Sequence, residues 1–198
     1  MQHSPIRGPE DEAQWLDETL DGLGLDGAHL LGVSIGGWTA TSLAVHRPVR
    51  VSSLALLDPA MTFARIPAKA VLASLALVVP GVPEAFRRRV LRWISGGADI
   101  DDSQPEADLI SAASKDFVLA KAPPKMFSDD QLRSVTVPVL ALIAGTSVIH
   151  DPARAAARAR RLLTRGQVEL WPDASHAING EYPDEIAHRA HRFWEEAA

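Results

Sequence analysis

A serine between two glycines is the first group in this sequence whose surroundings suggest chemistry. The stretch Gly32-Val33-Ser34-Ile35-Gly36 follows an apolar run, Ala28 to Val33, and leads into a helix-compatible run, Gly36 to His46. A serine at such a junction can be held in a sharp strand-to-helix turn that raises its hydroxyl above the edge of a sheet. The pattern therefore makes Ser34 a candidate nucleophile.

The residues around Ser34 fit the same geometry. We expect glycine at positions 32 and 36 because a side chain on Gly32 or Gly36 would collide with the neighbouring strand or helix in so tight a turn. The turn also places the backbone N–H of Ile35 at a helix N-terminus, where it can donate to a developing oxyanion.

A serine hydroxyl is a weak nucleophile near neutral pH, so Ser34 needs a general base. Of the seven histidines, His150 and His176 each follow an apolar run that is typical of a strand. His176 lies between the last expected strand and the last expected helix, and parallel sheets build their sites at the carboxyl ends of strands. We prefer His176 as the base and keep His150 as the alternative.

The base in turn needs an acid to orient it, and three aspartates are candidates. Asp58 ends the strand directly after the one that precedes Ser34, so it should lie at the same edge of the sheet. Asp151 follows the next expected strand, and Asp173 is too close in sequence to His176 to orient it easily. Asp58 precedes a proline and also fits an ordinary turn; we prefer Asp58 as the acid and keep Asp151 as the alternative.

Alternating strands and helices must position these groups. Four short apolar runs are typical of strands buried on both faces: Ala28 to Val33, Val51 to Leu57, Val137 to Ala144 and Gln167 to Trp171. Helical stretches flank them. The first begins at Pro9 and is stopped by Gly22 and Gly24, and the others are Gly36 to His46, Pro152 to Leu163 and Pro183 to Glu196. This alternation predicts an α/β fold in which helices cover both faces of a parallel sheet.

Residues 61–134 interrupt the alternation. They contain two helical pieces, Ala68 to Val79 and Pro83 to Ile94, then an acidic stretch at 96–108 and a Lys/Pro turn at 121–125. We expect residues 61–134 to be an inserted helical cap, with residues 1–60 and 135–198 forming the core.

Composition excludes several classes of protein. The 198 residues suit one domain, or one domain with a sub-domain, and 46 % hydrophobic with 23 % charged residues are ordinary globular values. A net charge of -5 argues against a nucleic-acid partner. The absence of cysteine excludes disulfides and thiolate sites, and neither a metal site nor an organic cofactor is indicated. Without a signal peptide or a membrane-length apolar run, we expect a cytoplasmic protein.

Four segments together resemble the α/β-hydrolase family, and more closely its bacterial carboxylesterase-like branch. They are GLDGAHLLGVSIGGWTA, LALLDPAMTF, VPVLALIAGTSVIHDPARA and WPDASHAINGEYPDEIAHRAHRFW. The resemblance implies a partial α/β-hydrolase fold, with Ser34 as nucleophile, His176 as base and the N–H of Ile35 as one oxyanion donor.

The resemblance also bears on the acid. Many members carry it in a Gly-x-x-Asp element, which here reads Gly145-Thr146-Ser147-Val148. Another branch takes the acid from the end of the strand after the nucleophile, where this chain has Asp58. The departure at Val148 therefore strengthens Asp58 and leaves Asp151 in reserve.

A serine nucleophile implies hydrolysis of a small carboxylic ester through an acyl-enzyme intermediate. One alternative is C–C bond hydrolysis or acyl transfer by the same triad. Another is a truncated, catalytically impaired module that only binds a ligand or partner.

The serine motif comes early in the chain compared with the family. In the family this motif normally follows the fifth strand of the sheet, whereas in this sequence it follows the first expected strand. Residues 1–27 therefore contain no counterpart of the upstream strands or of the loop that carries the second oxyanion donor. We expect activity to be lower, by about 10²- to 10³-fold, unless another segment supplies that donor. The strand Ala28 to Val33 should form a free apolar edge, which favours self-association or pairing. Three explanations of the early motif stay open: the sequence is a fragment, its start codon was wrongly chosen, or it is a short protein that pairs with another chain.

Overall fold

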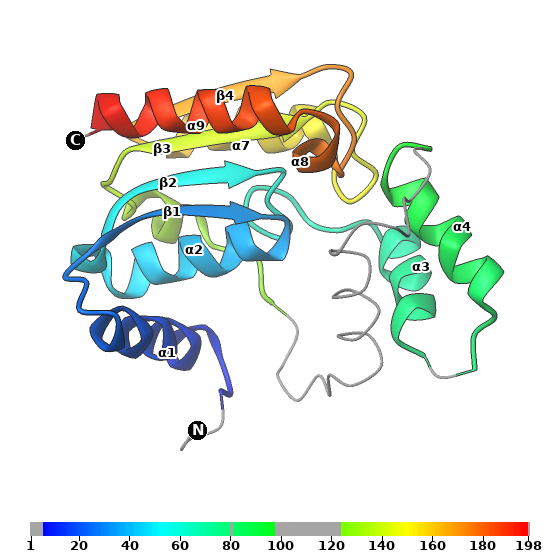
Figure 1. The fold of residues 1–198 in the computed structure, drawn as a ribbon, viewed down its shortest axis with the longest axis horizontal. Helices are drawn as coiled ribbons and strands as arrows, with labels where there is room; N and C mark the ends of the chain where they lie inside the picture. The colour runs from blue at the N-terminus through cyan, green and yellow to red at the C-terminus, as the bar shows by residue number, and fades with distance from the viewer. Residues whose placement is uncertain (1–5, 80, 98–123, 198) are drawn as a thin grey trace.

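The computed structural model describes residues 6–79, 81–97 and 124–197. Its centre is a four-stranded parallel sheet, which confirms the predicted α/β architecture (Figure 1). The strands lie in sequence order: β1 (Ala28–Val33), β2 (Val51–Leu57), β3 (Val139–Ala144) and β4 (Gly166–Trp171). All four carboxyl ends therefore meet at one edge, the edge at which the candidate residues were expected.

Helices cover both faces of the sheet, as predicted. On one face α2 (Ile35–His46) packs on β1 and β2, and α7 (Pro152–Leu162) packs on β3 and β4. On the other face lie α8 (Ile178–Glu181) and α9 (Pro183–Ala197), while α1 (Pro9–Gly22) packs against α2 (Figure 1). A short 3₁₀ helix, η1 (Pro48–Arg50), leads into β2.

Alternation along the central strands divides the core into two clusters. Leu54 and Leu56 of β2 face α2 and α7, whereas Leu57 faces α8 and α9. Successive side chains of a strand point to opposite faces, so a continuous apolar run is what a strand covered on both sides requires.

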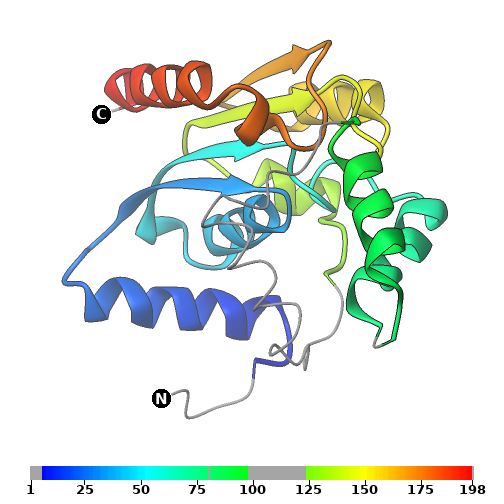
Figure 2. The same ribbon diagram turned by 45° about the vertical axis from the view of Figure 1, so that its right-hand side comes forward.

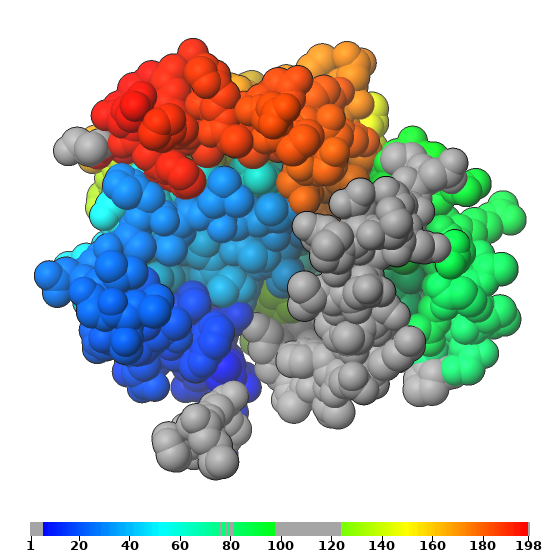
Figure 3. Space-filling model, viewed as in Figure 1, coloured from blue at the N-terminus to red at the C-terminus, as the bar shows by residue number. Residues whose placement is uncertain are grey.

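The prediction that all four strands are buried on both faces is wrong for β1 and β4. These are the edge strands among the described residues, and Leu31 and Leu170 are 44 % and 40 % exposed. In Figure 3 the β1 edge lies at the surface between α9 and α1. Only β2 and β3, which have strands on both sides, are almost completely buried.

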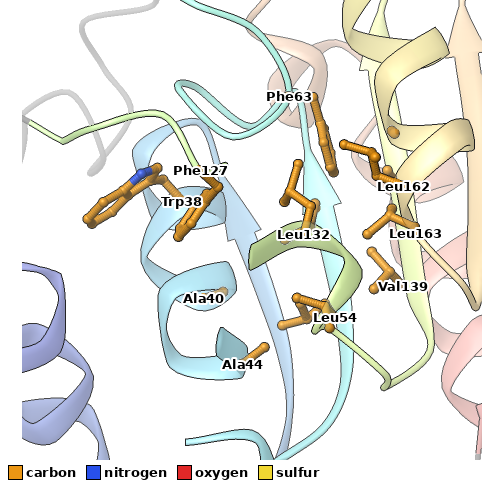
Figure 4. Packing of buried hydrophobic residues seen from close by; sticks show 14 of the residues in the cluster. Trp38, Ala40, Ala44, Leu54, Phe63, Phe127, Leu132, Val139, Leu162 and Leu163 are labelled. Carbon is orange, nitrogen blue, oxygen red and sulfur yellow. The ribbon is translucent and has the colours of Figure 1, made fainter. Parts of the chain in front are cut away.

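The end of the expected cap range packs in the main core. A short helix, α6 (Asp129–Arg133), begins with a capping box between Ser128 and Gln131. Leu132 is fully buried in the cluster beneath the sheet, and Phe127 stacks on Trp38 with ring centroids 5.4 Å apart (Figure 4). The last residues of the range 61–134 therefore pack with the core.

Two further helices in that range form a hairpin at the carboxyl end of the sheet (Figure 2). They are α3 (Ala68–Val78) and α4 (Glu84–Ile94), and Lys69 Nζ lies 5.8 Å from the ring centroid of Trp93. The predicted acidic stretch and Lys/Pro turn fall mainly outside the described residues. Among the described helices, none combines the length and apolar character needed to cross a membrane.

Candidate functional site

Ser34 occupies a strained turn between β1 and α2. Its backbone has φ 52° and ψ −119°, a conformation that non-glycine residues rarely adopt. Its N–H donates to Leu57 O at 3.0 Å, and its carbonyl accepts from the N–H groups of Gly37 and Ala60, each at 3.1 Å. The turn is thus fixed to the end of β2 and to the loop that follows it.

Close packing around the turn explains two glycines, one of which was not predicted. A Cβ on Gly32 would lie 2.4 Å from Gly36 O, so this position must be glycine. The same explanation is wrong for Gly36, because a Cβ there would meet no atom within 4 Å. The second steric requirement falls on Gly37, where a Cβ would lie 2.6 Å from Pro59 Cβ.

Asp58 follows β2 and is completely buried. It too has a positive φ, of 40°, and its N–H donates to Leu142 O at 2.8 Å. Its Oδ1 accepts from the backbone N–H of Ala144 at 3.0 Å, and its Oδ2 accepts from Ser147 Oγ at 2.6 Å. Strained backbone is concentrated at functional sites, and here it occurs at both Ser34 and Asp58.

His176, in the loop between β4 and α8, joins Asp58 to Ser34. Its Nδ1 lies 2.7 Å from Asp58 Oδ2, and its Nε2 lies 2.9 Å from Ser34 Oγ. Because an ionised carboxylate only accepts hydrogen bonds, Nδ1 carries the proton and Nε2 accepts from the serine hydroxyl. The structure thus brings Ser34, His176 and Asp58 together in one hydrogen-bonded chain.

The charge of Asp58 is held by its neighbours. Burial by itself raises the pKa of a carboxyl group, but contacts with His150, His176 and Ser147 outweigh it and hold the pKa of Asp58 well below its usual range. The group is therefore a carboxylate in the folded protein near neutral pH.

Contacts with neighbouring loops fix the segment that carries His176. Thr146, after β3, donates to Ala174 O through both its N–H, at 3.0 Å, and its hydroxyl, at 2.8 Å. On the other side, the N–H and hydroxyl of Ser175 donate to the Glu181 carboxylate at 2.8 and 2.6 Å.

The other candidates from the sequence take no part in the hydrogen bonds that join Ser34, His176 and Asp58. His150 contacts Asp58 and not Ser34: its Nε2 is 3.0 Å from Oδ1, at an angle that is not that of a hydrogen bond. Asp151 is the N-cap of α7 and accepts from the N–H of Arg154 at 3.0 Å, with its side chain about half exposed. Asp173 is exposed in the β4–α8 loop.

Ile35 is the first residue of α2, so its N–H is one of the helix N-terminal groups that have no acceptor within the helix. It lies directly after Ser34 and carries the positive end of the helix dipole. Within the described ranges no group of three histidines and carboxylates has a spacing that could hold a metal ion.

Sequence reasoning missed the contact of Ser147 with Asp58 and considered His150 only as a base. Both residues follow β3, whose carboxyl end lies beside that of β2. That adjacency was the available signal, but the contacts themselves depend on how the loop after β3 folds.

This geometry can generate an activated serine. Nε2 of His176 can take the hydroxyl proton, the Asp58 carboxylate stabilises the imidazolium that results, and Oγ then attacks an electrophilic carbon.

Comparisons with known proteins agree with this fold. The model of the alpha/beta hydrolase family matches residues 3–189. The chain is 30 % identical over 190 residues to the uncharacterized carboxylesterase nap of Bacillus subtilis, covering 93 % of this chain and 62 % of the relative. It is 27 % identical over 191 residues to carboxylesterase YbfK of the same organism, covering 92 % and 62 %.

A solved structure of a carboxylesterase has a similar fold. The crystal structure of naproxen esterase (carboxylesterase NP) from Bacillus subtilis superposes with a TM-score of 0.85 and 28 % identity, covering 96 % of this chain and 68 % of that one. The chain thus spans 62 % of the length of the curated carboxylesterases it matches. The family model matches most residues of this chain, which confirms the predicted resemblance. The chain belongs to the alpha/beta hydrolase family.

Proposed function

We propose that this protein hydrolyses small carboxylic esters, with Ser34 as nucleophile, His176 as general base and Asp58 as the acid that orients the histidine. The observation that carries the proposal is the pair of short contacts on either side of the His176 ring, 2.9 Å to Ser34 Oγ and 2.7 Å to Asp58 Oδ2. The carboxylesterase names of the similar proteins support the choice of ester over other acyl substrates.

The mechanism follows from these contacts. Ser34 Oγ attacks the ester carbonyl while Nε2 of His176 takes its proton, and Asp58 stabilises the imidazolium. The N–H of Ile35 donates to the oxyanion of the tetrahedral intermediate. His176 then gives the proton to the leaving alcohol, an acyl-enzyme forms on Ser34, and water releases the acid by the same steps.

We also propose that residues 61–134 act mainly as a cap over this site. The segment after α4 reaches the loop that carries the base, because a Cβ on Gly96 would lie 2.6 Å from Ser175 Cβ. Ile35 supplies one oxyanion donor through its backbone N–H, at the start of α2.

The test is hydrolysis of para-nitrophenyl acetate by Ser34→Ala and a matched serine variant. Ser53 suits the control because its hydroxyl also contacts a histidine, His29, at 2.8 Å. That pair lies within the sheet, and none of the ion pairs of the described residues joins His29 to an aspartate. We expect Ser34→Ala to abolish hydrolysis and Ser53→Ala to keep it. Unchanged hydrolysis in Ser34→Ala contradicts the proposal, and so does an equal loss in both variants of a folded protein.

We further propose that the protein self-associates through β1. Ser34 N–H bonds to β2, and alternate residues of a strand direct their N–H and C=O groups to opposite sides. His29, Leu31 and Val33 therefore present these groups at the edge of β1 that no other described strand covers. A second copy offers the same groups in antiparallel register, so two copies can pair about a twofold axis.

An apolar hollow beside this edge adds contact area for the second copy. Its volume is about 220 Å³, and its walls come from α1, β1 and α2, with Leu16, Leu20, Leu30 and Leu31 among the lining residues.

A further inference from the structure

Two histidines, not one, lie against the Asp58 carboxylate. His176 contacts Oδ2, and His150 Nε2 lies 3.0 Å from Oδ1. The His150 side chain is only 1 % exposed, and neither of its ring nitrogens forms a regular hydrogen bond with a described residue. The structure thus places the Asp58 carboxylate directly against Nε2 of a buried histidine.

Each oxygen of Asp58 is placed between one fixed donor and one imidazole. Oδ1 has the backbone N–H of Ala144 and the ring of His150, and Oδ2 has the hydroxyl of Ser147 and the ring of His176. A buried carboxylate is costly unless such groups compensate its charge. A nitrogen lone pair directed at a carboxylate oxygen 3.0 Å away would be repelled by it, so the nitrogen of His150 that faces Oδ1 carries the ring proton.

The orientation of the carboxylate decides whether His176 is held correctly. The last torsion of an aspartate side chain has a broad energy minimum, so the plane of the two oxygens is set by what surrounds them. The N–H of Ala144 restrains Oδ1 from one direction only. The imidazole of His150 fills the second direction and limits rotation of the group.

We propose that His150 is a positioning residue, which holds Oδ1 of Asp58 so that Oδ2 stays in line with Nδ1 of His176. The inference rests on the proposed function, because it assigns His150 to the same reaction. His150 touches neither Ser34 nor His176 in the contacts above, and its effect on turnover passes through Asp58.

The test compares three substitutions of His150. In His150→Gln the amide nitrogen reaches the place of Nε2 and keeps an N–H group beside Oδ1. In His150→Asn the amide stops short of that place, and His150→Phe keeps a ring without an N–H group. We expect kcat for para-nitrophenyl acetate to fall about 10- to 100-fold in the Asn and Phe variants, because small displacements of catalytic groups have effects of this size. KM should stay within about 3-fold, and Gln should restore most of kcat.

Two further measurements separate positioning from general damage to the fold. If His150 acts through Asp58, adding His150→Phe or His150→Asn to Asp58→Asn should cause no further loss of kcat. Proton NMR should show a far-downfield signal from the Nδ1–H of His176 in the wild type and in His150→Gln, shifted upfield or broadened in the Asn and Phe variants. Additive losses, or an unchanged signal and kcat in a folded Asn or Phe variant, would overturn the inference.

The NMR signal does not require turnover. If the wild-type chain hydrolyses no ester, the proposed function fails, while the dependence of the His176 signal on residue 150 still decides the positioning role. Should His150→Phe fail to fold, the Gln and Asn pair decides it alone, since these two variants share the amide and differ only in its reach.

Discussion

Replacing Asp58 with asparagine should reverse the proton positions on His176. The backbone N–H of Ala144 points at Oδ1 from 3.0 Å and needs an acceptor, so the amide oxygen of the substituted side chain should take that place. The amide NH₂ then occupies the position of Oδ2, where Ser147 Oγ can accept from it. His176 Nδ1, which lies 2.7 Å from Oδ2 in the wild type, must also become an acceptor.

The consequence falls on Ser34. With Nδ1 accepting, the ring proton of neutral His176 moves to Nε2, the nitrogen that lies 2.9 Å from Ser34 Oγ. This nitrogen can no longer take the serine proton. The corresponding substitution in a well-studied serine protease lowers kcat by about 10⁴-fold, which is about 5.4 kcal/mol at 1.36 kcal/mol per decade. We expect a loss of that order here.

The assay is kcat/KM for para-nitrophenyl acetate, with thermal unfolding to show that each variant is folded. Asp151→Asn is the matched control, because Asp151 caps α7 and should lose little activity. A loss below about 10-fold in folded Asp58→Asn would refute the tautomer argument. A larger loss in Asp151→Asn would transfer the role of acid to that residue.

Three other predictions concern acid stability, the serine turn and the sheet edge. The pKa of Asp58 lies below its usual range in the folded protein and near 3.9 in the unfolded chain, so protons bind the unfolded chain first. The free energy of unfolding should therefore fall as pH drops below about 4, and urea titrations should show a smaller fall in Asp58→Asn; equal pH slopes would contradict this. Gly32→Ala should lower the free energy of unfolding by about 1–3 kcal/mol through overpacking, whereas Gly36→Ala should change it by less than about 0.5 kcal/mol. Equal losses of stability in the two variants, measured in the same urea titrations, would oppose the steric argument. Leu31→Lys should reduce self-association in sedimentation velocity, and a monomeric wild type, or an unchanged distribution, would reject pairing through β1.

The candidate triad could be predicted because it depends on chain order. In a parallel sheet every strand ends at the same edge, so residues that directly follow strands are brought together wherever the strands lie. Ser34, Asp58 and His176 each come after a strand or in the loop beyond it. The Gly-x-x-Asp element of many family members has Val148 in place of its aspartate in this sequence, and this difference also favoured Asp58 as the acid.

Contacts that depend on three-dimensional packing were not predictable in the same way. The steric requirement falls on Gly37 rather than Gly36 because of how α2 approaches Pro59, which no local pattern reveals. A continuous apolar run also does not show how far each face of a strand is covered, so the faces of β1 and β4 were expected to be more buried than they are, although the edge position of β1 was predicted. The short helix α6, by contrast, has a sequence signal in its Ser128 and Gln131 capping box that was overlooked.

Covalent labelling tests directly whether Ser34 is the nucleophile. A fluorophosphonate reacts with a serine only when a base has activated it, and mass spectrometry of the digested protein then locates the modified residue. We expect a single label on the peptide that contains Ser34, absent from Ser34→Ala and strongly reduced in His176→Ala. A label on another residue, or no label on folded wild-type protein, would contradict this assignment of the nucleophile.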